Sequence, residues 1–344
     1  MWIVMIIILI LIALSFQSGP ARLEGSTPAS INTLEQIELN GVPQWISIRG
    51  MGGNKPVLLF LHGGPGSANL ALVRKQMPQL EKHFVVVNWD QRGAGKSIQI
   101  FPQQPLSAAQ LHADTHALVE YLKTRFEVEK IYLAGFSWGS VLGLTYAAQH
   151  PENLHAYFGI SQFVNGLEGE RISLDKMRQQ AEAQDPKALA ELAEINPENY
   201  ASPQGFSQLK TQRKWLLRFG NVYHTRDTYS HEAWMLFTAP EYSLVDFALW
   251  PYGSSQSLKR VYPEVMQINF KETIPSVQIP VVFLSGRYDY NTPQQLVADY
   301  FEQIDAPAGK SQVWFEDSAH AIIWDEPEKL AQAIVELAES CSTD

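Results

Sequence analysis

Cysteine is almost missing from this chain, since Cys341 is the only one among 344 residues. An intrachain disulfide is therefore impossible, and a zinc site built from several cysteines is excluded. Basic blocks are also missing and the net charge is −10, so the composition argues against a nucleic-acid partner. What is present, with 45 % hydrophobic and 18 % charged residues, is typical of a globular protein with a sizeable core.

The chain begins with sixteen uncharged residues, MWIVMIIILILIALSF, and Arg22 is the first charged side chain. The basic region that normally opens a signal peptide is missing, and the run is shorter than the roughly 18 apolar residues of a membrane span. A Ser-, Gly-, Pro- and Thr-rich stretch follows at 17–30. This combination favours export or anchoring over a buried core helix. We expect residues 1–30 to be a signal or anchor segment with its linker, and the protein to be periplasmic, extracellular or membrane-anchored rather than cytoplasmic. If the segment is not cleaved, any membrane contact is expected through it alone.

Beyond the linker, short apolar runs alternate with helical segments. Two alternating segments flank Asn40 and Gly41, a strong hairpin signal. Val-, Ile- and Leu-rich runs at 56–63, 84–90, 130–137 and 280–289 predict buried strands, with helices between them. The pattern predicts an α/β fold, with a mostly parallel central sheet and helices on both faces.

This alternation stops near residue 165. Through about 275 the chain is helical and aromatic, and it carries Trp215, Trp234 and Trp250. We interpret 165–275 as a helical cap inserted into an α/β core, whose first part is 31–164 and whose second part is 276–344.

A candidate nucleophile lies in GFSWGS, where Gly135 and Gly139 bracket Ser137 directly after an apolar strand. Such a strand–turn–helix elbow exposes the serine at the carboxyl edge of the sheet, and the glycines allow the helix to pack closely on the strand. The backbone N–H of Trp138 would then lie at a helix N-terminus, where it can bind an oxyanion. The alternative is a set of small residues at an ordinary strand–helix junction.

A serine needs a base and an orienting carboxylate. Of the nine histidines, His320 follows a predicted strand in a short polar loop before the last helix. Asp289 ends the strand before it, and the order Ser137, Asp289, His320 is the one this architecture uses. The competitor is Asp317, which we expect instead to hydrogen-bond the loop backbone.

Two glycine-rich loops follow earlier strands. HGGPG at 62–66 can offer backbone N–H groups to an oxyanion, with Gly64 as first choice of donor and Gly63 as second. GAGKS at 93–97 is half of a phosphate loop, but Asp90 stands where the first glycine is required, so we reject nucleotide binding. We expect Asp90 and Arg92 to brace this loop by an ion pair or backbone hydrogen bonds.

Together, HGGPG, DQRGAGKS, GFSWGS, GRYD and SAH resemble the α/β-hydrolase superfamily, and more narrowly the prolyl aminopeptidase (proline iminopeptidase) family. The resemblance covers the core, about 35–165 and 278–340. It implies an α/β-hydrolase fold with an inserted cap, and release of an N-terminal proline through a serine ester. It also implies that no cofactor or metal is needed. In that family acidic cap residues hold the free amino group of the substrate, and the candidates here are Glu232, Glu168 and Glu170.

The sequence thus predicts a serine hydrolase acting on a short peptide or another small molecule. An esterase or amidase for small hydrophobic substrates is the first alternative, suggested by the aromatic cap. A non-catalytic ligand-binding relative is the alternative of another class, and an intact triad argues against it.

Overall fold

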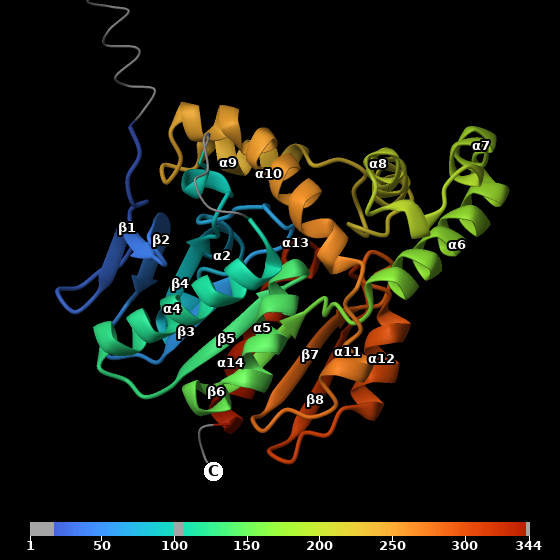
Figure 1. The fold of residues 1–344 in the computed structure, drawn as a ribbon. Helices are drawn as coiled ribbons and strands as arrows, with labels where there is room; N and C mark the ends of the chain where they lie inside the picture. The colour runs from blue at the N-terminus through green and yellow to red at the C-terminus, as the bar shows by residue number, and fades with distance from the viewer. Residues whose placement is uncertain (1–16, 100–105, 342–344) are drawn as a thin grey trace, which may run out of the picture.

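An eight-stranded sheet forms the centre of the molecule in the computed structural model, which describes residues 17–99 and 106–341 (Figure 1). In spatial order the strands are β1 (Ile31–Leu39), β2 (Val42–Gly50), β4 (Val85–Asp90), β3 (Val57–Leu61), β5 (Ile131–Phe136), β6 (Leu154–Ile160), β7 (Val281–Gly286) and β8 (Lys310–Phe315). Strand β2 is antiparallel to both β1 and β4, and every pair from β4 to β8 is parallel. The predicted mostly parallel sheet is confirmed.

The β1–β2 hairpin closes where the sequence predicts it. Leu39 pairs with Val42, which leaves a two-residue turn. Asn40 and Gly41 in this turn have φ of 50° and 74°. Two successive positive φ angles define the turn type that matches the twist of the strands it joins, and Asn-Gly is its preferred sequence.

Helices cover both faces of the sheet, as expected. Because successive strand residues point to opposite faces, Leu59 and Val87 join one core cluster while Leu58 and Val86 join the other. The first cluster is completed by α4 (Ala108–Phe126), α5 (Trp138–Gln149) and α12 (Gln294–Gln303). The second is completed by α2 (Leu72–Gln76), α3 (Leu80–His83), α13 (Ile322–Asp325) and α14 (Pro327–Cys341).

The segment from 72 to 83 has helical spacing, but Pro78 divides it. Helix α2 ends at Gln76 and α3 begins at Leu80. Proline lacks the N–H that a helix interior needs and disfavours helical geometry in the residue before it. Two short helices therefore form in place of one long one.

Between β6 and β7 the chain is helical, and we call helices α6 to α11 the cap (Figure 1). They are α6 (Gly166–Gln184), α7 (Pro186–Ala193), α8 (Pro203–Arg218), α9 (Ser230–Thr238), α10 (Leu244–Val265) and α11 (Phe270–Thr273). The cap contacts loops that follow the carboxyl ends of strands. Leu70 N–H donates to the Tyr242 hydroxyl (2.9 Å), Ser257 Oγ donates to the Gly93 carbonyl (3.1 Å), and Ala321 N–H donates to the Val222 carbonyl (2.7 Å). The cap therefore covers the sheet edge at which the sequence places its site.

Residues 17–30, interpreted from composition as a linker, are attached to the folded core. Ala21 and Leu23 are buried. The buried guanidinium of Arg49 donates to the Ala21 carbonyl (2.7 Å) while it pairs with Glu81 (2.6 Å). The uncharged residues 1–16, interpreted as a signal or anchor, lie outside the described residues. Within the described ranges, no helix has both the length and the apolarity to cross a membrane.

Candidate active site

Ser137 occupies the sharp turn between β5 and α5. Its φ of 54° and ψ of −116° are rare for a residue with a side chain, and strain of this kind clusters at functional sites. The flanking glycines are required by close packing. A Cβ at Gly135 would lie 2.4 Å from the Gly139 carbonyl oxygen, and a Cβ at Gly139 would lie 2.1 Å from that of Leu61. The local geometry is the elbow that the sequence predicts.

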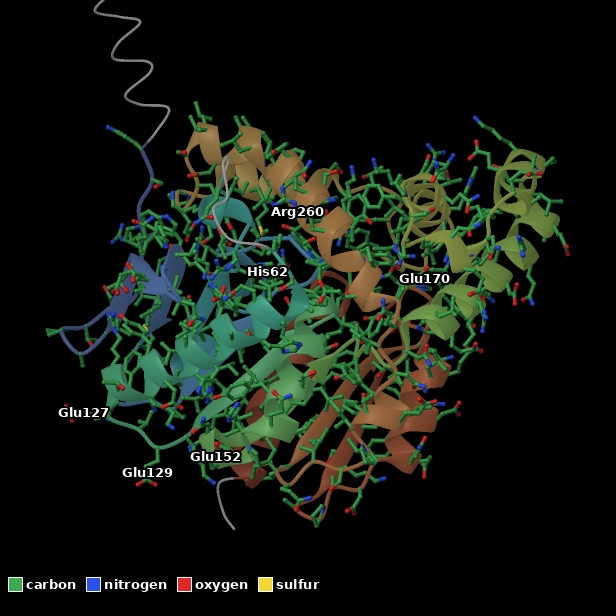
Figure 2. All side chains as sticks on the ribbon, viewed as in Figure 1. His62, Glu127, Glu129, Glu152, Glu170 and Arg260 are labelled. Carbon is green, nitrogen blue, oxygen red and sulfur yellow. The ribbon has the colours of Figure 1, made fainter. Side chains whose placement is uncertain are left out.

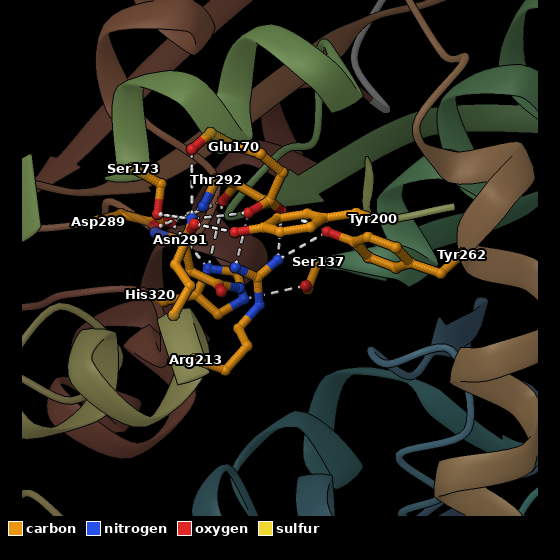
Figure 3. A network of polar contacts seen from close by, with 11 residues as sticks. Ser137, Glu170, Ser173, Tyr200, Arg213, Tyr262, Asp289, Asn291, Thr292 and His320 are labelled. Carbon is orange, nitrogen blue, oxygen red and sulfur yellow. Dashed lines mark hydrogen bonds and ion pairs between the residues drawn. The ribbon is translucent and has the colours of Figure 1, made fainter. Parts of the chain in front are cut away.

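The fold brings Ser137, His320 and Asp289 into one hydrogen-bonded relay (Figure 3). The Nε2 atom of His320 lies 2.9 Å from Ser137 Oγ, and its Nδ1 atom lies 2.9 Å from Asp289 Oδ2. The histidine and aspartate are buried, and the serine is 9 % exposed. A base in contact with the hydroxyl and oriented by a carboxylate is the arrangement that activates a serine nucleophile.

Asp289 is held by its own loop. Its Oδ1 atom accepts the backbone N–H groups of Asn291 and Thr292, each at 2.9 Å, and Oδ2 accepts the Thr292 hydroxyl at 2.8 Å. These donors fix the carboxylate plane toward His320. Sequence reasoning missed Thr292, although an aspartate followed at short range by Asn and Thr is a signal for such a local turn.

Asp317 does not contact His320 in the described structure and is exposed. The expectation that the Asp317 carboxylate hydrogen-bonds the loop backbone was wrong. The N–H of Ala319 donates to Asp325 (3.1 Å), and the N–H of Asp317 itself donates to Glu326 (3.2 Å). Asp325 is the last residue of the short helix α13 and Glu326 follows it, so the carboxylates that bind the loop backbone come from the end of this helix.

The HGGPG loop lies against the serine. A Cβ at Gly63 would be 3.3 Å from the Cβ of Ser137, and Gly64 has a φ of 122° that side-chain-bearing residues rarely adopt. Among the described residues, the backbone N–H groups of Gly63, Gly64 and Trp138 make no hydrogen bond. Gly63 and Trp138, the residue that follows Ser137, therefore offer free donors beside the serine, with Gly64 next in the same loop, and such donors can stabilise a developing oxyanion.

Gln91, which sequence reasoning missed, joins the two segments that carry these donors. Its Nε2 donates to the carbonyl of His62 (3.0 Å) at the start of the HGGPG loop, and its Oε1 accepts the indole N–H of Trp138 (3.1 Å). Its own N–H donates to His62 Nε2 (3.1 Å), and burial lowers the pKa of that histidine to about 4, so the ring stays neutral and accepts. Gln91 therefore positions both donor segments.

We expect Gln91→Ala to lower kcat about tenfold or more with little change in KM, because the oxyanion donors would lose their common brace. Steady-state kinetics on an arylamide substrate would measure this. The matched control is Gln332→Ala, an exposed glutamine on α14, which should leave kcat unchanged. A Gln91→Ala protein that is folded and has wild-type kcat would contradict the positioning role.

The expected bracing by Asp90 and Arg92 is present, but not as a pair. Buried Asp90 accepts the N–H groups of Asn69 (3.1 Å) and Lys96 (2.9 Å), and burial raises the pKa of this carboxyl to about 7. Arg92 instead forms a two-pronged ion pair with Asp114 (2.6 and 2.9 Å). Each residue therefore holds its loop through a separate contact.

Two of the three acidic cap candidates already have cationic partners. Glu168 is half-exposed and lies 3.4 Å from Arg171. Glu170 is buried inside the cap, unlike surface carboxylates such as Glu127 and Glu129 (Figure 2). It is hydrogen-bonded to Arg213, Tyr262 and Gln212 (Figure 3). Its charge is thus compensated within the protein, and it ties α6, α8 and α10 together.

Glu232 on α9 differs, because both of its carboxylate oxygens are buried without a hydrogen-bond partner among the described residues. Burial, and to a smaller extent the nearby Asp325 carboxylate, raise the pKa of Glu232 to about 7. Asp325 accepts the N–H of Ala319, the residue before His320. Glu232 therefore lies near the His320 loop with unused hydrogen-bonding capacity. Within the described ranges, no group of three or more His, Cys, Asp or Glu side chains is placed to hold a metal ion.

Several known proteins are similar to this chain along most of their length. Residues 56–327 match the family model described as alpha/beta hydrolase fold. The probable aminopeptidase YbaC of Bacillus subtilis (strain 168) is 30 % identical over 313 residues, which cover 89 % of this chain and 96 % of the relative. The proline iminopeptidase of Heyndrickxia coagulans is 22 % identical over 84 % of this chain and 92 % of its own. Among solved structures, the proline iminopeptidase of Mycobacterium smegmatis has a TM-score of 0.66 at 18 % identity and covers 90 % of this chain and 98 % of its own, a likeness of fold.

Proposed function

The chain belongs to the alpha/beta hydrolase fold family, and from this premise we propose that it is a serine hydrolase acting through an acyl-enzyme. The observation that carries the proposal is the buried relay in which His320 contacts both Ser137 and Asp289 at 2.9 Å. A non-catalytic ligand-binding relative would have no need of this relay on a strained elbow.

The proposed reaction has two halves. Ser137 Oγ attacks the substrate carbonyl while His320 Nε2 takes the hydroxyl proton, and Asp289 stabilises the imidazolium that forms. The N–H groups of Gly64 and Trp138 bind the oxyanion, with Gly63 as the alternative donor. His320 then gives the proton to the leaving group. Water, deprotonated by the same histidine, hydrolyses the ester and restores the serine.

We propose a peptide with N-terminal proline, or a similar small residue, as the substrate. Two similar proteins are described as a probable aminopeptidase and a proline iminopeptidase. An aminopeptidase must bind a free ammonium group, and the cap offers Glu232 as a buried carboxylate with no hydrogen-bond partner in the described part of the chain. Glu170 is neutralised by Arg213 and Glu168 is exposed beside Arg171, so both rank behind it.

Glu232→Gln should remove the preference for a free amine. A desolvated ion pair of this kind is worth about 2–5 kcal/mol, so wild type should prefer a proline arylamide over its N-acetylated form by roughly 30-fold or more in kcat/KM. Because the pKa of Glu232 is about 7, the preference should shrink as pH falls below that value and the carboxylate is neutralised. Turnover of both substrates by the two proteins, at several pH values, measures this. Glu168→Gln is the matched control and should retain the preference.

Three results are distinguishable. A preference that disappears only in Glu232→Gln supports an aminopeptidase that uses this residue. A preference that survives in Glu232→Gln would show that Glu232 does not bind the free amine, while the aminopeptidase activity itself would still be supported. Equal turnover of free and blocked substrates by wild type supports the second candidate, an esterase or amidase for small hydrophobic substrates. The aromatic character of the cap, which carries Trp215, Trp234 and Trp250, favours that candidate.

A further inference from the structure

The outer face of α9 and the first turns of α10 carry an exposed apolar surface, which we call the α9–α10 patch. It consists of the exposed side chains of Trp234, Phe237, Leu244 and Tyr252, together with half-buried Phe247, which packs against a core cluster beneath them. Trp234 is 65 % exposed and Leu244 is 54 % exposed. The rings are contiguous, with centroids 5.9 Å apart for Trp234 and Phe237 and 5.3 Å apart for Phe237 and Phe247. Large contiguous apolar surfaces mark interaction sites.

The patch is not part of the inner lining of the cap. On α9, the neighbouring side chains of Met235 and Leu236 point inward and are buried in two core clusters. Helix α9 is therefore already packed on its inner side, while Trp234 and Phe237 project from its outer side. The outer side has no cover from the described residues.

The described start of the chain is fixed beside this patch (Figure 1). The N–H of Gly19 donates to the carbonyl of Pro240, which lies between α9 and α10 (2.8 Å). Lys96 Nζ donates to the hydroxyl of Ser18 (2.9 Å) and pairs with Asp246 on α10 (2.8 Å). In the sequence, the uncharged and mostly apolar residues 1–16 come directly before this attached stretch.

We propose that the α9–α10 patch rests on the surface of a lipid bilayer, into which residues 1–16 also insert. Ser15 is the one polar residue in the sequence of residues 1–16, so covering the patch could bury only part of their apolar side chains, whereas a lipid bilayer can bury all of them. Trp, Tyr and Phe are the side chains that favour the interface between headgroups and hydrocarbon. Stable membrane attachment usually takes two signals, and here they are adjacent.

The attachment is apolar rather than electrostatic. The chain has a net charge of −10, so anionic headgroups would repel it, and Lys96 at the edge of the patch is neutralised by Asp246. Binding should therefore occur on zwitterionic phosphatidylcholine and depend little on salt. This inference does not depend on the proposed catalytic activity.

Quenching by brominated phosphatidylcholine tests the contact directly on the full chain. Vesicles of this lipid should quench part of the tryptophan fluorescence, and Trp234→Phe should lose the share contributed by Trp234 while it keeps an apolar ring. The matched control is Trp314→Phe, on the edge strand β8 at the other end of the sheet. This substitution should leave the fluorescence intensity that is lost to quenching unchanged. A vesicle-bound chain in which Trp234 is not quenched would overturn the proposal, as would a chain that does not bind the vesicles.

A second measurement distinguishes lipid from two other groups that could cover the patch, which are residues 1–16 and a second copy of the chain. Combined Trp234→Gln, Phe237→Gln and Leu244→Gln substitutions should weaken partitioning into phosphatidylcholine vesicles on the order of tenfold, since apolar burial is lost. Unchanged or stronger partitioning would mean that residues 1–16 cover the patch. A dimer in sedimentation velocity that the same substitutions dissociate, with partitioning unaffected, would assign the patch to a second copy of the chain.

Discussion

Replacing Ser137 or His320 by alanine should lower kcat by a factor of about 10⁴ to 10⁶, because each side chain takes part in every bond-making step of the proposed reaction. Ser137 Oγ supplies the bond to the substrate, and His320 Nε2, 2.9 Å away, moves the proton. Without His320 the Ser137 hydroxyl keeps its proton, and without Ser137 the histidine has no nucleophile to activate. The double variant should therefore be no slower than either single variant, and kinetics of all three proteins would show this non-additivity.

Both variants should remain folded. The side chains of Ser137 and His320 are small parts of a loop-built site, and neither belongs to a core cluster. Circular dichroism and thermal unfolding provide the control. A folded Ser137→Ala protein with near wild-type kcat would refute the mechanism.

Asp289→Asn should lower kcat by about 10⁴, the cost typical of losing the orienting carboxylate of a serine–histidine pair. Asparagine keeps the shape but can place an amide donor against His320 Nδ1, where the carboxylate now accepts at 2.9 Å. The proton of the imidazole would then favour Nε2, and that atom could no longer accept the Ser137 proton. Steady-state kinetics across pH would measure the loss.

Asp317→Asn is the matched control for this substitution. Asp317 is exposed in the same loop as His320 and makes no contact with it in the described structure. Its variant should have wild-type kcat. If Asp317→Asn were severe and Asp289→Asn mild, the orienting carboxylate would be misassigned.

Much of the site could be predicted because its geometry is encoded locally. A Cβ at Gly135 or Gly139 would lie only 2.4 or 2.1 Å from a backbone oxygen, which no side chain could tolerate. The glycine spacing in the sequence is therefore enough to predict the turn at Ser137. Carboxyl ends of parallel strands meet at one edge, so strand counting places Asp289 and His320 beside the serine. The sequence resemblance to prolyl aminopeptidases is confirmed by relatives that align with most of the chain.

The rest depends on contacts between distant segments. Gln91 reaches Trp138 across 47 positions, and Arg213 neutralises Glu170 across 43, pairings that no local pattern contains. Glu168, Glu170 and Glu232 therefore look equivalent in the sequence, although only the last lacks a partner among the described residues. The composition of residues 17–30 is that of a linker, yet this stretch is attached to the core, because the buried Arg49 donates a hydrogen bond to the Ala21 carbonyl.

Labelling with a fluorophosphonate probe tests the central claim most directly, because such a probe reacts covalently with an activated serine and needs no knowledge of the substrate. We predict a single adduct on the full chain, located on Ser137 by peptide mass spectrometry, and formed far more slowly in His320→Ala. An intact, folded chain that takes no label, or takes it on another serine, would contradict the account.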